Sequence, residues 1–267
     1  MLPFLKWPGG KRWFVTQHAH LLPTKYETYI EPFLGSGAVF FHLEPRKARL
    51  GDANADLIAT YRAIKKDPTG VERHLRRHHR HHTSNYYYAV RDGDMRNDVT
   101  RAARFVYLNR TCFNGIYRVN LEGKFNVPVG TKTAVILDTD DFAATAKLLR
   151  RATIRDCDFT ELIDTAGSGD LVFADPPYTV RHNNNGFVKY NETLFSWADQ
   201  ERLARTLASA VQRGAKVVAT NAAHDEIRAL YPQPTFSVVE VERYSAISSD
   251  SASRRAYREL VIRANCD

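Results

Sequence analysis

The chain has 267 residues, 43% of them hydrophobic and 25% charged, enough for one large domain, or a domain with an insertion, around a sizeable core. No apolar run reaches the roughly 18 residues of a membrane span, and the first residues lack a signal-peptide pattern. A net charge of +8 and a pI near 9.4 suit a polyanionic partner.

The first pattern along the chain predicts a strand, a glycine turn and a helix. Residues 26–30 are β-rich, residues 31–37 contain two turn glycines, and residues 38–43 read as a buried helix. Such a turn lets the backbone approach a ligand closely, as in nucleotide-binding α/β units. A second strand is expected at residues 48–52. Its last residue, Asp52, follows the first turn glycine by 17 residues, which suits a carboxylate that binds ribose hydroxyls.

A basic insertion is predicted from about residue 61 to residue 150, where Arg, His, Tyr and Asn become frequent. Residues 73–82 contain five histidines and four arginines. We expect this run to form a solvated basic helix face near phosphates. A metal site is one alternative, but no Cys, Asp or Glu is interleaved to complete a ligand shell. An ordinary exposed surface is the other.

The insertion also contains a predicted helix and a predicted β-hairpin. Residues 100–109 read as helical, and two β-rich arms flank Glu122 and Gly123 within residues 111–128. The aromatic, amide and arginine side chains of this hairpin are the types that read base edges. A structural hairpin that covers the core is the alternative.

The α/β pattern resumes after the insertion. A capping-box-like start at Ser196 opens a helix that Gly214 ends. Strands are expected at residues 152–159, 171–174 and 216–221, and at residues 236–241 and 259–262, which could pair at the end of the sheet.

The tetrapeptide Asp175-Pro176-Pro177-Tyr178 directly follows the apolar run at residues 171–174. Because a Pro-Pro pair stops a strand abruptly, the tetrapeptide is expected in a stiff loop at the carboxyl end of that strand. Open α/β sheets bind ligands at this end of their strands. The Asp175 carboxylate and the Pro176 carbonyl can each accept one N–H of an exocyclic amine. Tyr178 can stack on the ring that carries this amine. An ordinary proline turn is the alternative.

Together and in this order, the motifs resemble those of the Dam-type (α-group, D12 class) DNA adenine-N6 methyltransferases over nearly the whole chain. Residues 5–11 resemble the amino-terminal motif of the family, although Pro8 stands where most relatives have Ala. The glycine turn, the acid at Asp52, the hairpin and the tetrapeptide match the remaining motifs. The resemblance implies an α/β, Rossmann-like S-adenosylmethionine-dependent methyltransferase fold. Residues 1–60 and 151–267 would form its catalytic domain, and residues 61–150 an inserted helical and β-hairpin DNA-recognition domain.

The resemblance also implies roles for individual residues. The catalytic group would be Asp175, Pro176, Pro177 and Tyr178. The cofactor S-adenosylmethionine would be bound by Trp7, Lys11, Glu31, Phe33, Gly35, Gly37, Asp52, Asp158, Phe159 and Asp175. DNA would be bound by Lys6, Phe113, Asn114, Ile116, Arg118, Asn120 and Pro128. No metal ligand is implied.

The implied activity is site-specific methylation of adenine N6, with the base flipped out of double-stranded DNA at GATC or a related short site. Cytosine-N4 methylation is an alternative, because cytosine also presents an exocyclic amine. Methylation of RNA or of a protein glutamine is a second alternative, and Asp175 disfavours the glutamine substrate. A catalytically silent DNA-binding module is a third alternative.

We expect a monomer with no membrane or metal partner, and a cognate restriction endonuclease is an open question. Cys112, Cys157 and Cys266 lack metal-ligand spacing, which fits a reduced cytoplasm.

Overall fold

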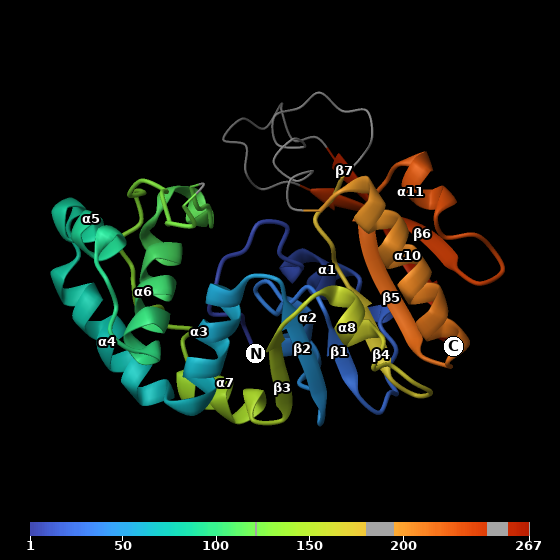
Figure 1. Cartoon of the computed structure of the whole chain (residues 1–267), viewed down its shortest axis with the longest axis horizontal. Helices are drawn as coiled ribbons and strands as arrows, with labels where there is room; N and C mark the ends of the chain where they lie inside the picture. The colour runs from blue at the N-terminus through green and yellow to red at the C-terminus, as the bar shows by residue number, and fades with distance from the viewer. Residues whose placement is uncertain (121, 180–194, 245–255, 267) are drawn as a thin grey trace. The chain divides into compact units, whose positions relative to one another are not determined.

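The structure is a computed structural model that describes residues 1–120, 122–179, 195–244 and 256–266 (Figure 1). These residues pack as two compact units. The first comprises Met1–Val15, Leu34–Arg46 and Gly51–Asp156, and the second the described parts of Thr16–Phe33, Lys47–Leu50 and Cys157–Asp267. The boundaries of the two predicted domains remain a prediction.

The strands of the described chain form one sheet in the order β3-β2-β1-β4-β5-β7-β6. Its parallel part consists of β1 (Tyr29–Glu31), β2 (Ala48–Asp52), β4 (Leu171–Ala174) and β5 (Lys216–Ala222). Every residue of β1 and β4 is buried, as is typical of parallel strands covered on both faces. The α/β fold with a mostly parallel central sheet is therefore confirmed, and β2 and β4 have the predicted bounds.

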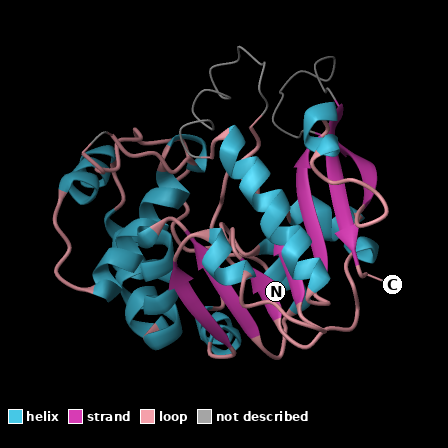
Figure 2. Ribbon diagram, turned by 45° about the vertical axis from the view of Figure 1, so that its right-hand side comes forward, coloured by secondary structure: helices cyan, strands magenta, loops and turns pink. Residues whose placement is uncertain are grey.

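The sheet ends in an antiparallel pair, β6 (Ser237–Tyr244) and β7 (Ala256–Ala264), which lies beside β5 in Figure 2. The predicted pairing of these two segments is confirmed. The register places Glu259 of β7 opposite Ala222 of β5. A carboxylate thus lies at the carboxyl end of the parallel strand that neighbours β4.

Two predicted strands are shorter than expected. β1 covers Tyr29–Glu31, whereas residues 26–30 were expected to be extended. β3 covers Ala152–Asp156, whereas residues 152–159 were expected to be extended. The chain turns because Asp158 caps the helix α8 (Phe159–Ile163), its Oδ1 accepting the Thr160 N–H at 2.9 Å.

The helices form where caps and apolar periodicity agree. α2 has its predicted bounds, and α10 begins after Ser196, whose side chain forms the expected capping box with Asp199. The predicted helix at residues 100–109 is part of the longer α6, and residues 73–81 of the basic run lie in α4. The helix bounds are α1 Arg12–Gln17, η1 Ala19–Leu21, α2 Ala38–Leu43, α3 Ala55–Lys66, α4 Pro68–His81, α5 Ser84–Asp92, α6 Asp98–Thr111, η2 Phe113–Gly115, α7 Phe142–Leu149, α8 Phe159–Ile163, α10 Trp197–Gln212 and α11 Asp225–Ala229.

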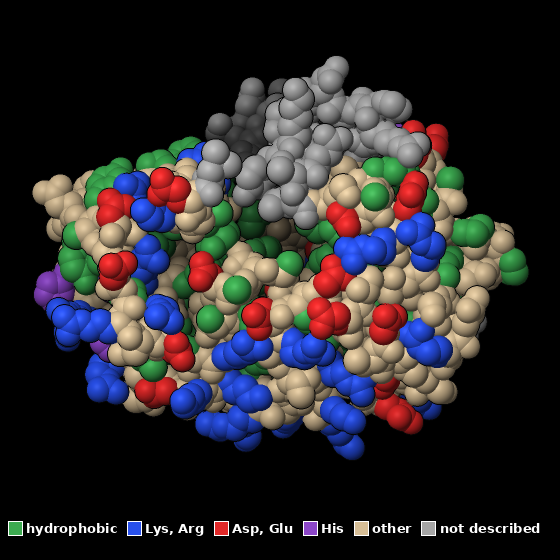
Figure 3. Space-filling model, viewed as in Figure 1, with side chains coloured by type: hydrophobic (Ala, Val, Ile, Leu, Met, Phe, Trp, Pro, Cys, Tyr) green, Lys and Arg blue, Asp and Glu red, His purple; other side chains and the backbone are tan. Residues whose placement is uncertain are grey.

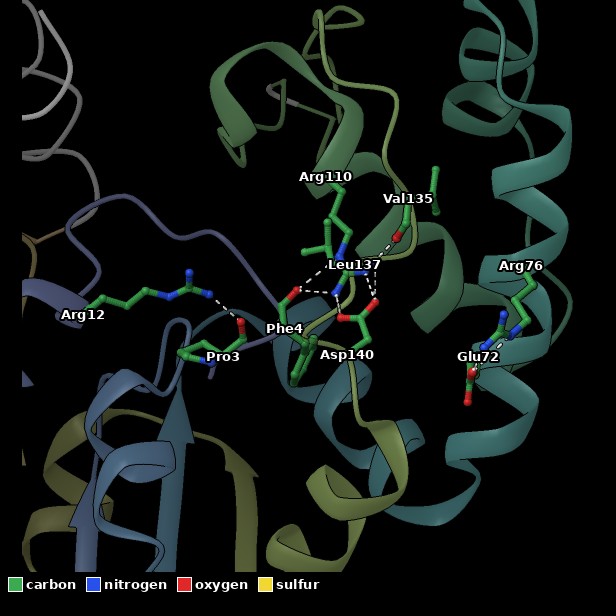
Figure 4. A network of polar contacts seen from close by, with 9 residues as sticks. All are labelled: Pro3, Phe4, Arg12, Glu72, Arg76, Arg110, Val135, Leu137 and Asp140. Atoms are coloured by element: carbon green, nitrogen blue, oxygen red, sulfur yellow. Dashed lines mark hydrogen bonds and ion pairs between the residues drawn. The ribbon is translucent and has the colours of Figure 1, made fainter. Parts of the chain in front are cut away.

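The end of α6 fixes the amino-terminal segment of the first unit. The Arg110 guanidinium donates to Asp140 Oδ1 and Oδ2, each at 2.6 Å, and to the Phe4 carbonyl at 2.8 Å (Figure 4). Asn109 exchanges two hydrogen bonds with the Lys6 backbone, at 3.0 and 2.8 Å. Arg110 is only 3% exposed. Its buried charge is tolerated because the guanidinium N–H groups donate to the Asp140 carboxylate and to backbone carbonyls.

Candidate active site and DNA-binding surface

In the first unit, the glycine turn and the acid that follows it are joined directly. The Gly35 N–H donates to Asp52 Oδ2 at 2.9 Å, and the Asn54 N–H donates to Oδ1 at 3.0 Å. Burial raises the pKa of Asp52, although these two hydrogen bonds act to lower it. A carboxylate oxygen has two lone pairs, so Asp52 can accept further hydrogen bonds from hydroxyl groups.

Trp7 lies against the glycine turn. Gly35 and Gly37 both have positive φ angles, +48° and +66°. A Cβ atom on Gly35 would lie 2.7 Å from Cδ1 of Trp7, so this contact requires glycine. Trp7 itself begins a tight turn in which the Gly10 N–H donates to its carbonyl at 3.0 Å. The indole ring of Trp7 therefore lies against the backbone of the glycine turn, where Gly35 has no side chain.

A small cavity opens at the same place. Its volume is about 170 Å³, and it is lined by Leu5, Lys6, Trp7, Gly10, Arg12 and Ser36. Nearby in sequence, Lys11 is 3% exposed, and its Nζ donates to the Gly9 carbonyl at 3.3 Å. The first unit thus combines a buried ammonium group, an aromatic face and a fixed carboxylate.

In the second unit, the tetrapeptide leaves β4 as predicted and is held at both ends. Thr220 Oγ1 of β5 donates to Asp175 Oδ1 at 2.8 Å. The Tyr178 hydroxyl donates to Glu259 Oε2 of β7 at 2.6 Å, and Arg243 pairs with the other oxygen of that carboxylate at 3.5 Å. Two neighbouring strands therefore position the acid and the aromatic ring of the loop.

The surroundings of Tyr178 keep its hydroxyl protonated. Burial and the nearby Asp175 and Glu259 carboxylates raise its pKa well above the ordinary value, and a hydrogen bond with Thr220 acts in the opposite direction. The hydroxyl therefore remains a hydrogen-bond donor at neutral pH.

The middle of the loop is held by an amide pair. Gln200 Nε2 of α10 donates to the Pro177 carbonyl at 3.2 Å, and Asn221 Nδ2 donates to Gln200 Oε1 at 2.9 Å. Gln200 and Asn221 are fully buried. The contact involves the Pro177 carbonyl rather than that of Pro176, the group predicted to hold a substrate amine.

Each of the other predicted cofactor residues of the second unit contacts a neighbouring side chain. Phe33 stacks on Phe159 with ring centroids 5.4 Å apart. Asp158 is held by Arg202 through two hydrogen bonds of 2.7 and 2.9 Å. Burial acts to raise the pKa of Asp158, but the hydrogen bonds from Arg202 and Thr160 lower it. Glu31, 3% exposed, accepts a 2.9 Å hydrogen bond from the Tyr29 hydroxyl.

The predicted hairpin is folded back on itself but does not form two regular strands in its described part. Isolated bridges pair Cys112 with Val129 and Val119 with Phe125, and the turn includes Gly123 at a φ of +75°. η2 replaces the start of the first arm. All seven predicted DNA-contacting residues are exposed: Lys6, Phe113, Asn114, Ile116, Arg118, Asn120 and Pro128.

The hairpin is tied to the cofactor motif within the first unit. Tyr117 stacks on Trp7 with ring centroids 5.7 Å apart, and its hydroxyl donates to Asp56 Oδ2 at 2.9 Å. Arg118 is oriented by a 2.8 Å hydrogen bond from its Nε to Asn126 Oδ1. The exposed side chains of the hairpin therefore project from a fixed base.

A sequence model described as D12 class N6 adenine-specific DNA methyltransferase matches residues 7–247. This chain belongs to that family. The D12-class protein is accordingly an adenine-specific DNA methyltransferase, whose substrate is DNA and which requires a methyl donor.

Relatives agree over almost the whole length of this D12-class enzyme. The Type II methyltransferase M1.LlaDCHI of Lactococcus lactis subsp. cremoris is 35% identical over 97% of this chain and 94% of its own length. The Type II methyltransferase M.MjaIII of Methanocaldococcus jannaschii is 33% identical over 97% and 98%. The DNA adenine methylase of Escherichia coli (strain K12) is 31% identical over 97% and 93%.

Several residues that hold the tetrapeptide of the D12-class enzyme were not predicted. Thr220, Gln200, Asn221 and Glu259 carried no functional expectation. One signal was available, since Thr220 and Asn221 are polar residues at the end of an apolar strand, and parallel strands end at the same edge. Glu259 could not be found in this way, because its position depends on the antiparallel register.

Proposed function

We propose that this D12-class enzyme transfers a methyl group from S-adenosylmethionine to the N6 amine of an adenine flipped out of duplex DNA at a short specific site. The tetrapeptide supports this proposal most directly. Thr220 and Glu259 hold Asp175 and Tyr178 from neighbouring strands, which presents an acceptor and an aromatic ring together. An exocyclic amine on a flat ring needs both groups.

The residues fit S-adenosylmethionine in the chemistry of their groups. The cavity of about 170 Å³ beside Trp7 is smaller than the ~300 Å³ or more of typical ligand pockets, so it suits one end of a ligand. We infer that Trp7 and Lys11 contact the methionine end and Asp52 the ribose. The adenine end would be bound by Glu31, Phe33, Asp158 and Phe159. Because Gly35 and Gly37 have no side chains, the ligand could approach the backbone closely at the glycine turn. When bound, the cofactor supplies an electrophilic methyl group.

Catalysis then rests on positioning by this chain. Asp175 and the Pro176 carbonyl accept the two N–H groups of the amine, so that the nitrogen lone pair points away from the plane of the base. Tyr178 stacks on the ring. Preorganised acceptors also stabilise the positive charge that develops on nitrogen. Asp175 is the group placed to take the proton afterwards.

DNA recognition is assigned to the hairpin. The Arg118 guanidinium, oriented by Asn126, suits a bidentate guanine contact worth about 1–3 kcal/mol of discrimination. Lys6 would contact a second guanine, and Ile116, Asn120 and Pro128 neighbouring positions. Phe113, 53% exposed, and Asn114 would fill the gap left by the flipped base. These assignments follow the resemblance, as does GATC or a related target.

We further propose that the enzyme acts as a monomer, because one chain can approach one base. We propose a cytoplasmic location and a cognate restriction endonuclease as a candidate partner. No helix in the described part of the chain is long and apolar enough to cross a membrane.

The test is methylation of unmodified genomic DNA with S-adenosylmethionine, mapped by single-molecule sequencing. We expect N6-methyladenine in one short motif, and none with Asp175→Ala, which should fold normally. The exposed Asp138→Ala serves as the matched control. Modified cytosine would instead assign the cytosine-N4 activity, and near-normal turnover by Asp175→Ala would refute the proposed mechanism.

A further inference from the structure

Helix α4 has two chemically opposite faces. Val71, Leu75 and His78 are buried, at the i, i+4, i+7 spacing of one helix face. Four exposed arginines lie on the opposite face, three or four residues apart, and are called here the arginine stripe: Arg73, Arg76, Arg77 and Arg80. Figure 3 shows blue and purple basic side chains at the left edge, where Figure 1 places α4 and α5.

The arginine stripe is not explained by the stability of the helix. In the described part of the chain, Arg76 has an acidic partner, Glu72 at 2.5 Å, whereas Arg73, Arg77 and Arg80 have no carboxylate within ion-pair distance. Like charges three or four residues apart destabilise a helix by about 0.2–0.5 kcal/mol per pair. Only the last turn gains from the helix dipole. Three unpaired cations on one stripe therefore favour an external anion.

The carboxyl end of α4 stands beside the helix that carries the hairpin. His78 stacks on Tyr107 of α6 with ring centroids 4.7 Å apart, and His82 Nδ1 lies 2.8 Å from the Tyr107 hydroxyl. α6 ends at Thr111, and the hairpin follows immediately. The arginine stripe thus belongs to the same unit as the proposed base-reading residues.

We propose that the arginine stripe binds backbone phosphates of duplex DNA that flanks the methylation site. The proposal rests on DNA being the substrate. From Arg73 to Arg80 the helix rises roughly 10 Å, about the axial rise of three phosphates on one strand. Because arginine contacts to phosphate carry no sequence information, the stripe adds affinity for neighbouring duplex without changing the target. It would keep the enzyme on DNA between successive methylations.

The test compares two duplexes that share the same methylation site, one of about 12 and one of about 40 base pairs, over a salt series. The variant combines Arg73→Gln, Arg77→Gln and Arg80→Gln, and the control combines Arg46→Gln, Arg150→Gln and Arg151→Gln, three exposed arginines of the same unit. We expect the α4 variant to reduce the slope of log K against log salt by about two to three on the long duplex alone. The control should leave both slopes unchanged.

A second readout is the number of sites methylated in one encounter on a two-site duplex, which should fall for the α4 variant. Methylation of the short duplex by the α4 variant should be unaffected. If the proposed activity itself is wrong, the wild type will modify no adenine on either duplex, which distinguishes that failure from a failure of the arginine-stripe proposal. An unchanged slope on the long duplex would overturn the proposal and leave a different partner, such as an acidic protein. Equal losses on both duplexes, or equal losses in the control, would also overturn it.

Discussion

Glu259 is the residue through which the antiparallel end of the sheet acts on the tetrapeptide. Glu259 is 3% exposed, and its carboxylate accepts a charge-assisted hydrogen bond of 2.6 Å from the Tyr178 hydroxyl. Glu259→Gln keeps the size but removes the charge, so the ring of Tyr178 should be held less firmly. We expect kcat to fall about 10- to 100-fold with little change in cofactor affinity, measured by steady-state kinetics and calorimetry.

Two further variants separate this role from a general loss of stability. Tyr178→Phe removes the hydroxyl, so adding Glu259→Gln to it should cause little further loss if Glu259 acts through that hydroxyl. Additive losses would contradict the assignment. Glu240→Gln on β6, an exposed carboxylate with arginine partners of its own, should leave kcat unchanged.

At the scale of elements, the contact of α4 with α6 should depend on pH. The ring of His78 packs on Tyr107. Burial, and to a smaller extent the neighbouring His74, Arg77 and His81, lower the pKa of His78 from 6.5 to about 4. The unfolded chain therefore binds more protons below pH 6.5, and stability is lost as the pH falls from 6.5 toward 4. Between pH 7.5 and pH 5 this loss should be about 2 kcal/mol of unfolding free energy.

The measurement is urea denaturation at both pH values for the wild type, His78→Phe and the exposed His79→Phe. His78→Phe should lose about 2 kcal/mol less than the wild type on acidification, because it has no buried imidazole to protonate. His79→Phe should behave as the wild type does. The same pH dependence in all three proteins would show that other groups cause it.

Elements with a strong local signal could be predicted closely. β4 has the predicted bounds because an apolar run ends at a Pro-Pro pair, and α10 begins where the capping box of Ser196 requires. β3 ends earlier than predicted because the cap at Asp158 outweighs strand propensity. The hairpin arms are joined by two isolated bridges rather than by a regular ladder of strand pairs. The amino-acid composition of the arms does not distinguish these two arrangements.

At the scale of the whole molecule, sequence could predict the proposed chemistry but not what holds it in place. Three features were predictable: the glycine turn, Asp52 and the tetrapeptide. Each lies in a short stretch of sequence whose residues also lie close together in the structure. The Thr220, Gln200 and Glu259 contacts join residues from 23 to 81 positions apart, and depend on which strands and helices become adjacent. Such contacts need the strand order and the antiparallel register.

The stack of Trp7 on Tyr117 has a thermodynamic consequence. If the cofactor orders Trp7 as proposed, it also restricts the Tyr117 ring at the base of the hairpin, which favours the geometry that binds DNA. Linkage is reciprocal, so duplex DNA must then tighten cofactor binding by the same factor, about 5- to 100-fold. Calorimetric titration of the cofactor with and without duplex would measure it, and Tyr117→Leu should abolish the difference, whereas Tyr88→Leu should preserve it. A bound methyl donor would in this way act as an allosteric effector of target search, so that the enzyme engages DNA most tightly when it is loaded to react.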